Sequence, residues 1–255
     1  MTPAFQQALF AIAAFLLADA TLPAETASEL MEKGDPFYAR LQAAEALKFY
    51  LPAEKLDPKN VHLVVRISRE YRHLMSDATK SEEKRKLGGL AVDYARRAAA
   101  LDPNDPDAQL AVAISYGKLL PFEGTRERIE ASRIIKAAAD KVIALDPRND
   151  LAWHVLGRWH LTLADVGALN RAVAEVAYSK LPTSTYEEAV ICFEKAIELK
   201  PDRLMHYIEL GRAFAKVGRN DDARRYLKMG LAMRETEKDD PETRREGREI
   251  LAKLH

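Results

Sequence analysis

A short motif that ends in proline recurs four times in this sequence of 255 residues and divides it into helical units. Each copy closes an alanine-rich stretch. The copies are Leu56-Asp57-Pro58, Leu101-Asp102-Pro103, Leu145-Asp146-Pro147 and Leu199-Lys200-Pro201. Proline lacks a backbone N–H and clashes with the preceding helical turn, so each motif marks the end of a helix. Internal repetition of this kind constrains the whole fold.

The residues after each proline follow the tetratricopeptide pattern, in which a large residue is followed by Leu-Gly and then by an aromatic. After Pro201 these positions are filled by Tyr207, Leu210, Gly211 and Phe214. The small residue lets the two helices of a hairpin approach closely, and the large residues form the buried stripe of the first helix. The pattern therefore predicts stacked helical hairpins.

The second helices repeat a small-large-small spacing at the tetratricopeptide period of 34 residues. The two sets are Ala189, Phe193 and Ala196, and then Ala223, Leu227 and Gly230. Earlier units are longer, because the four prolines lie 45, 44 and 54 residues apart. The longest insertion, at 165–185, has an apolar helical face at Leu169, Val173 and Val176 and is predicted to be an extra helix.

The two ends of the repeat region also read as helices. Residues 26–55 predict a degenerate first hairpin that turns at Gly34-Asp35-Pro36, and residues 241–254 predict a charged capping helix. We therefore predict an all-α fold over residues 25–255. It is a tetratricopeptide-like right-handed superhelix of about five helical hairpins, with an extra inserted helix and a C-terminal capping helix.

Residues 1–24 read as a signal peptide or an N-terminal apolar leader. The uncharged run 8–17 has the length of a signal-peptide core and is too short to span a bilayer, and Ala18 and Ala20 suit a signal peptidase. No Lys or Arg precedes the run, so an apolar first helix is the alternative. We expect an exported, periplasmic or secreted protein if the leader is cleaved, and a membrane-associated or cytoplasmic one otherwise. We expect no transmembrane helix in the mature chain.

Composition argues against several classes of function. Lys plus Arg and Asp plus Glu number 39 each, so no global field attracts nucleic acid. The single cysteine, Cys192, precludes an intrachain disulfide and a cysteine metal cluster, and it reads as a small core residue. The sequence has no glycine-rich phosphate loop, G-x-S-x-G or H-E-x-x-H, and its six histidines are scattered. We predict no catalysis, no cofactor and no metal.

The first helix of each hairpin is predicted to line a concave groove, and the groove positions are cationic with apolar gaps. They are Arg66, Arg69, Arg72, His73, Leu110, Ile114, Lys118, His154, Arg158, Arg212 and Lys216. Guanidinium groups form bidentate bonds to carboxylates, so this strip suits an acidic or C-terminal peptide. The alternative is that these cations pair with acidic residues of neighbouring helices, where exposed pairs contribute about 0–1 kcal/mol.

Three segments carry a resemblance to a known family: LGRW at 156–159, LPTSTYEEA at 181–189 and ELKP at 198–201. With the long insertion between the first two, they resemble the regulator of microtubule dynamics protein family, from about residue 60 to the C-terminus. The resemblance implies a non-enzymatic tetratricopeptide adaptor, in a family linked to microtubules, organelle surfaces and lipid handling. Relatives with a long anchor and coiled coil differ from this short leader, which favours an exported, bacterial-type relative.

Three hypotheses of function follow. The leading one is a protein-interaction scaffold or adaptor that binds a peptide or protein partner in its concave groove. The alternative is a carrier of lipid or another apolar ligand, with the inserted helix at 165–185 as a lid. The third is a structural subunit of a larger envelope assembly, which the sequence does not separate from the first.

Overall fold

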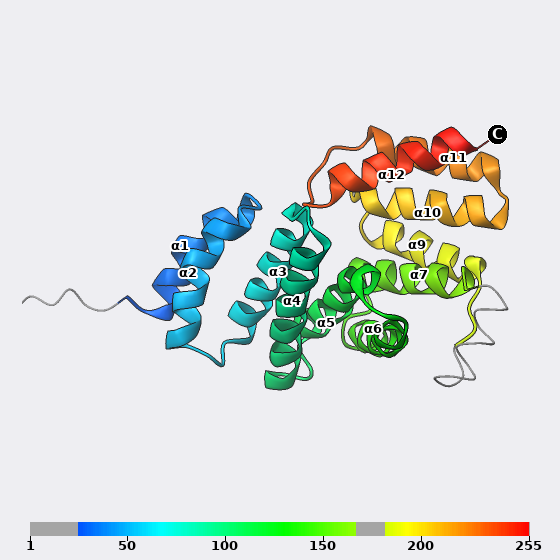
Figure 1. Ribbon diagram of the computed structural model, residues 1–255. Coiled ribbons are helices and arrows are strands. Elements are labelled where there is room, and N and C mark those ends of the chain that lie inside the picture. Colours follow the sequence, from blue (N-terminus) through cyan, green and yellow to red (C-terminus); the bar gives the residue numbers. More distant parts are fainter. Residues whose placement is uncertain (1–24, 167–181, 255) are drawn as a thin grey trace, which may run out of the picture.

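The computed structural model describes residues 25–166 and 182–254, and these ranges contain helices and no strand (Figure 1). The helices are α1 (Ala27–Ala39), α2 (Ala43–Leu56), α3 (Val61–Asp77), α4 (Ser81–Leu101), α5 (Pro106–Leu119), α6 (Thr125–Leu145), α7 (Asp150–Ala164), α9 (Tyr186–Leu199), α10 (Leu204–Val217), α11 (Asn220–Ala232) and α12 (Asp240–Lys253). A single 3₁₀ turn, η1 (Leu120–Phe122), follows α5. The predicted all-α fold is confirmed.

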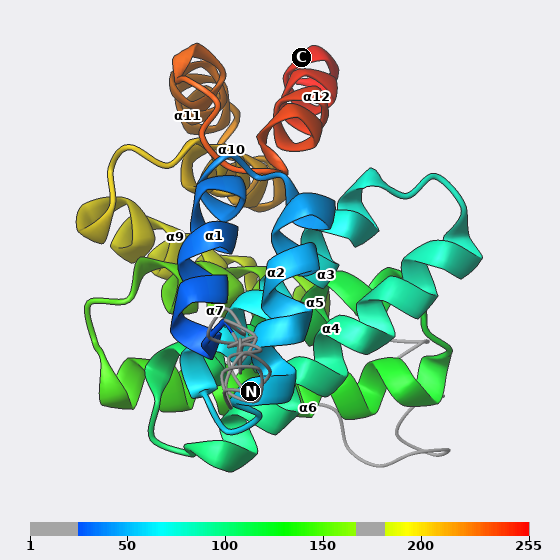
Figure 2. The same ribbon diagram turned by 90° about the vertical axis from the view of Figure 1, so that its left-hand side faces the viewer.

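The helices pair into hairpins that stack along the chain. The pairs are α1 with α2, α3 with α4, α5 with α6, α7 with α9, and α10 with α11. The first helices of successive hairpins also touch, α3 with α5, α5 with α7 and α7 with α10, so they form the inner layer of the superhelix. Helix α12 packs on α10 and α11, and Figure 2 shows α11 and α12 on either side of α10. The five hairpins and the capping helix match the prediction.

The proline motifs end one helix and prepare the start of the next. Two residues after the proline of the first motif, the Asn60 side chain accepts a hydrogen bond from the Leu63 N–H and caps α3. Asp105 and Asn149 cap α5 and α7 in the same way. Such N-caps typically stabilise a helix by about 1 kcal/mol. The first three motifs with their caps therefore reverse the chain within a few residues, whereas α10, after the fourth motif, begins without a side-chain cap.

The turn of the first hairpin is not where the sequence predicted it. Gly34-Asp35-Pro36 lies inside α1, and the chain turns at residues 40–42, where Leu41 has a φ of 58°. A Cβ atom at Gly34 would lie 2.5 Å from Cε1 of Tyr50, so this glycine makes room for a ring of α2. The Tyr50 hydroxyl donates to Asp35 Oδ1 over 2.7 Å. The glycine serves a helix contact, and the prediction of a turn there was wrong.

Close helix contacts at small residues build the core of the later hairpins. A Cβ at Gly157 would lie 2.7 Å from the buried ring of Phe193, and one at Gly211 would lie 2.6 Å from Leu227 Cγ. These are the positions at which the repeat pattern placed its small residue. The predicted helix–helix approach is present in both hairpins.

Two predicted segments lie outside the described residues: the leader at 1–24 and residues 167–181 of the predicted inserted helix. On either side of the second segment, α7 ends at Ala164 and α9 begins at Tyr186 with the predicted capping box of Thr185 and Glu188. Within the two described ranges, no helix is long and apolar enough to cross a membrane.

Candidate interaction surface

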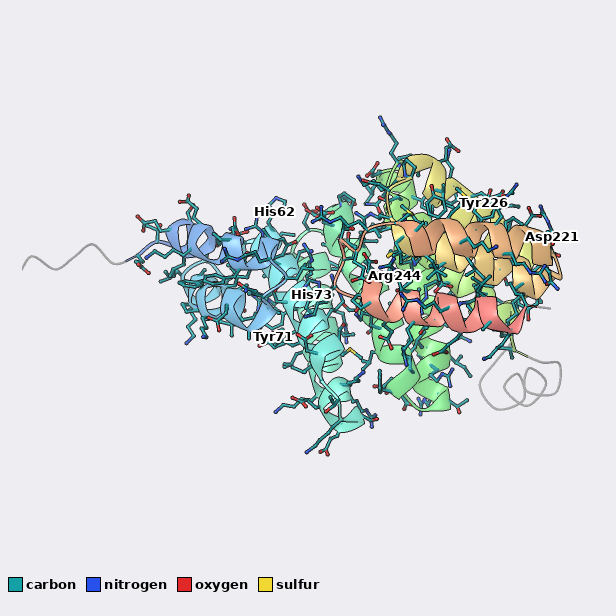
Figure 3. The ribbon with its side chains drawn as sticks, turned by 90° about the horizontal axis from the view of Figure 1, so that it is seen from above. His62, Tyr71, His73, Asp221, Tyr226 and Arg244 are labelled. Carbon is teal, nitrogen blue, oxygen red and sulfur yellow. The ribbon has the colours of Figure 1, made fainter. Side chains whose placement is uncertain are left out.

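The loop between α11 and α12, residues 233–239, reaches back across the inner helix layer to α3 and α5. Figures 1 and 3 both place the start of α12 beside the end of α3, and Figure 3 labels His73 on α3 and Arg244 on α12. The partners of this loop lie far away in the sequence: Ser76 is 163 residues from Asp239, and Lys118 is 121 residues from it. We call this segment the α11–α12 loop.

Asp239 is the residue of the loop that is bound most completely. Its Oδ2 and Oδ1 atoms lie 2.6 and 2.8 Å from Lys118 Nζ, and its Oδ1 atom lies 2.8 Å from Ser76 Oγ. Lys118 Nζ also donates to Ser76 Oγ over 2.7 Å. The ammonium group thus uses its three donors within one small cluster, which we call the carboxylate cradle (Ser76 and Lys118).

The positive charge of Lys118 in the carboxylate cradle is balanced by the negative charge of Asp239. Burial lowers the pKa of Lys118, and the attraction of Asp239 offsets part of that effect. Burial alone would raise the pKa of Asp239, yet the ion pair with Lys118 and the bond from Ser76 outweigh it and hold the pKa below its ordinary value. The two groups therefore favour each other's charged forms, as a partly buried ion pair does.

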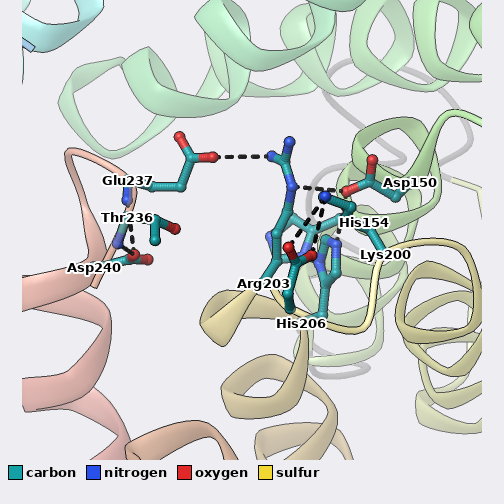
Figure 4. Close-up of polar contacts among 9 residues, drawn as sticks. Asp150, His154, Lys200, Arg203, His206, Thr236, Glu237 and Asp240 are labelled. Atoms are coloured by element: carbon teal, nitrogen blue, oxygen red, sulfur yellow. Dashed lines mark hydrogen bonds and ion pairs between the residues drawn. The ribbon is translucent and has the colours of Figure 1, made fainter. Parts of the chain in front are cut away.

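Two further ion pairs and an internal cap hold the loop. Lys238 Nζ lies 2.6 Å from Asp77 Oδ1, and Glu237 Oε1 lies 3.3 Å from Nη1 of Arg203 at the start of α10. Asp240 Oδ2 accepts hydrogen bonds from the backbone N–H groups of Thr236 and Glu237 over 2.7 and 2.8 Å (Figure 4). The loop therefore carries acidic and basic side chains and is a folded segment attached to three helices.

Two predicted groove residues, Arg72 and His73, are buried next to the carboxylate cradle. Arg72 Nη1 donates to Ser68 Oγ and Ser115 Oγ over 3.1 and 3.0 Å, and burial followed by the charge of Arg69 lowers its pKa to about 10. Burial, with the positive charges of Arg69 and Arg72, lowers the pKa of His73 to about 3. His73 is therefore neutral near pH 7 and adds no positive charge to the face.

Most of the other predicted cations of the groove have acidic partners in the fold. Arg212 Nε lies 3.2 Å from Glu209, and Arg212 Nη2 lies 2.5 Å from Glu246 of α12. Lys216 Nζ lies 2.6 Å from Asp165, and Arg66 Nη1 lies 2.5 Å from Asp35. Ion pairing within the chain, the alternative reading of the strip, therefore applies at these positions.

Arg69 and Arg158 are the predicted groove cations with the weakest acidic partners. The Arg69 guanidinium lies 4.2 Å from the ring centroid of Tyr38 on α1, and it makes no ion pair within 4.0 Å in the described residues. The Arg158 side chain is 65% exposed, and its nearest carboxylate oxygen, on Glu209, is 4.0 Å away. Both side chains can therefore still bind an external carboxylate.

The three remaining predicted groove residues are not free cations. Leu110 is buried in a core cluster with Val142 and Ala152, and Ile114 is partly buried against the same cluster. His154 is buried beside Phe193, with 5.5 Å between ring centroids. These positions hold helices together.

The sequence analysis missed a buried polar chain that runs from His154 to the α11–α12 loop. His154 Nδ1 lies 3.0 Å from His206 Nδ1, and His206 Nε2 lies 2.8 Å from Asp150 Oδ2 (Figure 4). Asp150 Oδ2 is also 3.1 Å from Nε of Arg203, which pairs with Glu237. Spacing along one helix carries no signal for this chain of contacts, because its members belong to α7, α10 and the loop.

A buried carboxyl group on α3 was also missed. Glu70 is 0% exposed, and both of its carboxyl oxygens are without a hydrogen-bond partner in the described part of the chain. Its Oε1 atom lies 3.6 Å from His73 Nδ1. Burial raises the pKa of Glu70 to about 7, against the opposing charges of Arg69, Arg72 and Lys238.

The sequence also led to predictions about metal binding and about Cys192. In residues 25–166 and 182–254, no group of three or more His, Cys, Asp or Glu side chains could hold a metal ion. Cys192 is buried, and burial raises the pKa of its thiol to about 12, as predicted for a core cysteine. A shallow depression of about 250 Å³ lies between α9 and α10, lined in part by Val190, Ile191 and Phe214.

Comparison with known proteins identifies the family. A family model described as Regulator of microtubule dynamics protein 1-3 matches residues 30–255. The chain belongs to this family. Regulator of microtubule dynamics protein 1 of Bos taurus is 30% identical over 192 residues, which are 74% of this chain and 60% of the bovine protein. The mouse (Mus musculus) protein 1 is 28% identical over 229 residues, 89% of this chain and 74% of its own.

This member of the family spans only part of some relatives, since the match to human (Homo sapiens) protein 2 takes in 48% of that protein. Its fold resembles that of solved tetratricopeptide structures. A thermophilic TPR protein of Thermus thermophilus aligns with a TM-score of 0.65 at 16% identity, over 89% of this chain and all of the other. A MamA protein of Desulfovibrio magneticus RS-1 aligns with a TM-score of 0.51 at 14% identity, over 80% and 93%. These likenesses show the fold alone.

Proposed function

We propose that this protein is a non-enzymatic tetratricopeptide scaffold that binds an acidic segment of a protein partner on its inner helix layer. One observation carries the proposal: the inner layer already binds two carboxylates of its own chain, Asp239 in the carboxylate cradle and Glu237 on Arg203. A surface that binds carboxylates of the α11–α12 loop has the chemistry to bind carboxylates of another chain.

The cations left without strong partners support the same surface. Arg69 and Arg158 retain free donors on α3 and α7, on either side of Lys118 on α5 in the order of the stacked inner helices. Planar guanidinium groups recognise carboxylates bidentately, and one such bond is stronger than a neutral hydrogen bond. The preferred partner is therefore an extended segment with acidic residues.

The test is affinity capture from native lysate with the wild-type chain and with an Arg69→Glu/Arg158→Glu variant. The matched control is Arg126→Glu/Arg225→Glu, which reverses two exposed arginines on α6 and α11, away from the inner layer. We expect a protein partner that is captured by the wild type and by the control and is lost with the first variant. Capture that survives the first variant excludes this surface.

The same preparations test the two other hypotheses. Native mass spectrometry detects a co-purified lipid, which would favour the carrier, and a complex that persists through size exclusion would favour a permanent subunit. If the leader at 1–24 is cleaved as a signal peptide, the partner is exported with this chain, and N-terminal sequencing of the secreted or periplasmic fraction tests for that cleavage.

A further inference from the structure

Residues 234–239 of the α11–α12 loop are held by polar contacts, whereas Met233, the first residue of the loop, packs against the apolar core of α10 and α11. Residues 234–239 are exposed or half-buried, and their attachments are the ion pairs of Glu237, Lys238 and Asp239 with α10, α3 and α5. Partly exposed ion pairs contribute little net free energy because both partners are hydrated when apart. The loop can therefore leave the inner layer at small cost.

Helix α12 has a separate anchor that does not depend on the loop. Its Ile250, Leu251 and Leu254 side chains pack against a core cluster that contains Leu204 and Ile208 of α10. Gly247 lets α12 approach closely, since a Cβ there would lie 2.7 Å from Ile208 Cδ1. The loop can therefore detach from α3 and α5 while α12 stays docked as the cap.

Departure of the loop would change the charge of the inner layer. With Asp239 in place, Lys118 is neutralised and lies between two cations that can still bind, Arg69 of α3 and Arg158 of α7. Without it, Lys118 joins them, and basic side chains then follow three consecutive inner helices. An acidic segment that needs all three meets a complete site only after Asp239 leaves.

We propose that the α11–α12 loop is an intramolecular competitor for the partner site, so that an acidic partner segment binds only by displacing Asp239 from Ser76 and Lys118. This inference rests on the proposed function, because it assigns the ligand class and the regulation of the same surface. The loop itself indicates the ligand: an acidic stretch with an aspartate that enters the carboxylate cradle.

The experiment uses the full chain, the variant Asp239→Asn and a fluorescent acetylated peptide that copies residues 235–242 (ETEKDDPE). The matched control is Asp221→Asn, which removes one negative charge from α11, where Asp221 pairs only with Arg224 in the described structure. Hydrogen exchange of residues 233–240 reports loop release, and fluorescence anisotropy reports peptide binding. A peptide with Asn at the position of Asp239 tests whether the protein recognises that carboxylate.

We expect Asp239→Asn to speed exchange in the loop and to tighten peptide binding by about tenfold. The reason is that the apparent Kd equals the intrinsic Kd divided by the fraction of molecules with an open site. Asp221→Asn should do neither. Adding Lys118→Met to Asp239→Asn should abolish the gain, and the Asn-containing peptide should bind weakly to every variant.

Three results overturn the inference. Unchanged exchange in Asp239→Asn would mean that the ion pair does not hold the loop. Faster hydrogen exchange of the loop in Asp239→Asn, with equal peptide affinity in the wild type and the variant, would show that the loop does not compete with the peptide. The proposed function would then be unaffected. Faster exchange with no peptide binding to either chain would remove the acidic-ligand basis of the proposed function as well.

Discussion

His154 of α7 and His206 of α10 meet inside the protein with 3.0 Å between their Nδ1 atoms, although 52 residues separate them in the sequence. Both residues are buried. His206 Nε2 faces the carboxylate of Asp150, so that nitrogen carries a proton. Burial, and then the charges of His206, Arg158 and Arg203, lower the pKa of His154 well below its ordinary value. The two facing nitrogens therefore share one N–H···N hydrogen bond.

Replacing one histidine of this pair should lower the free energy of unfolding by more than half of the loss caused by replacing both. His206→Leu leaves a polar nitrogen of His154 buried without a partner, and we expect it to lower the free energy of unfolding by about 2 kcal/mol. His154→Leu should act similarly. The double variant removes both polar rings and should cost less than the sum of the single changes. Urea unfolding measures the three values, and additive losses would show that the rings are not coupled.

The buried carboxyl of Glu70 predicts a stability that depends on pH. Its pKa is raised to about 7 in the fold, whereas in the unfolded chain the pKa stays near its ordinary value of 4.5. Between these values the unfolded chain binds fewer protons, so this group makes the fold less stable as pH rises. From about pH 4.5 to 7.5, Glu70→Gln should therefore gain stability relative to the wild type, on the order of 2 kcal/mol.

His73 acts in the opposite direction, which is why the comparison uses difference curves. Its pKa falls to about 3 in the fold from the ordinary value of 6.5, so it stabilises the fold as pH rises between those values. Thermal unfolding of the wild type, Glu70→Gln and the exposed control Glu32→Gln over this pH range gives the curves. Parallel curves for the wild type and Glu70→Gln would contradict a raised pKa at Glu70.

Two helical glycines should respond in opposite ways to alanine. In Gly157→Ala the new Cβ meets the Phe193 ring at 2.7 Å, and we expect a loss of about 1–3 kcal/mol from overpacking. In Gly117→Ala the new Cβ has no atom within 4 Å, and the helix should gain up to about 1 kcal/mol because alanine is the better helix former. Urea unfolding distinguishes the two. Equal effects would mean that Phe193 moves aside freely.

Cys192 should report unfolding, because it is the single thiol of the chain. In the fold it is buried with a pKa raised to about 12 by burial and then by the charge of Glu188, so little thiolate is present at pH 8. We expect a thiol reagent to modify the native protein far more slowly than the urea-unfolded chain. Labelling of the native protein as fast as the unfolded chain would contradict burial.

How much the sequence predicts depends on the range of the interaction. Helix ends, the hairpin repeat and the capping helix follow from proline chemistry, N-caps and the spacing of small and large residues, all of which act over a few residues. The turn at Gly34 was predicted wrongly because glycine and proline signal a turn locally, while the ring of Tyr50, from the next helix, decides the geometry. The repeat register also predicted basic groove positions on the first helices, but it did not predict that Arg72 and His73 would be buried.

The sequence by itself determined the fold class, the repeat and the family of this protein, because periodicity encodes which face of each helix is buried. Only the tertiary structure decided which carboxylate meets which cation. The contact of Asp239 with Lys118 spans 121 residues and depends on the curvature by which successive hairpins bring α12 back to α3 and α5. That curvature depends on all the helix contacts in between. A local sequence pattern therefore does not predict where the α11–α12 loop will bind.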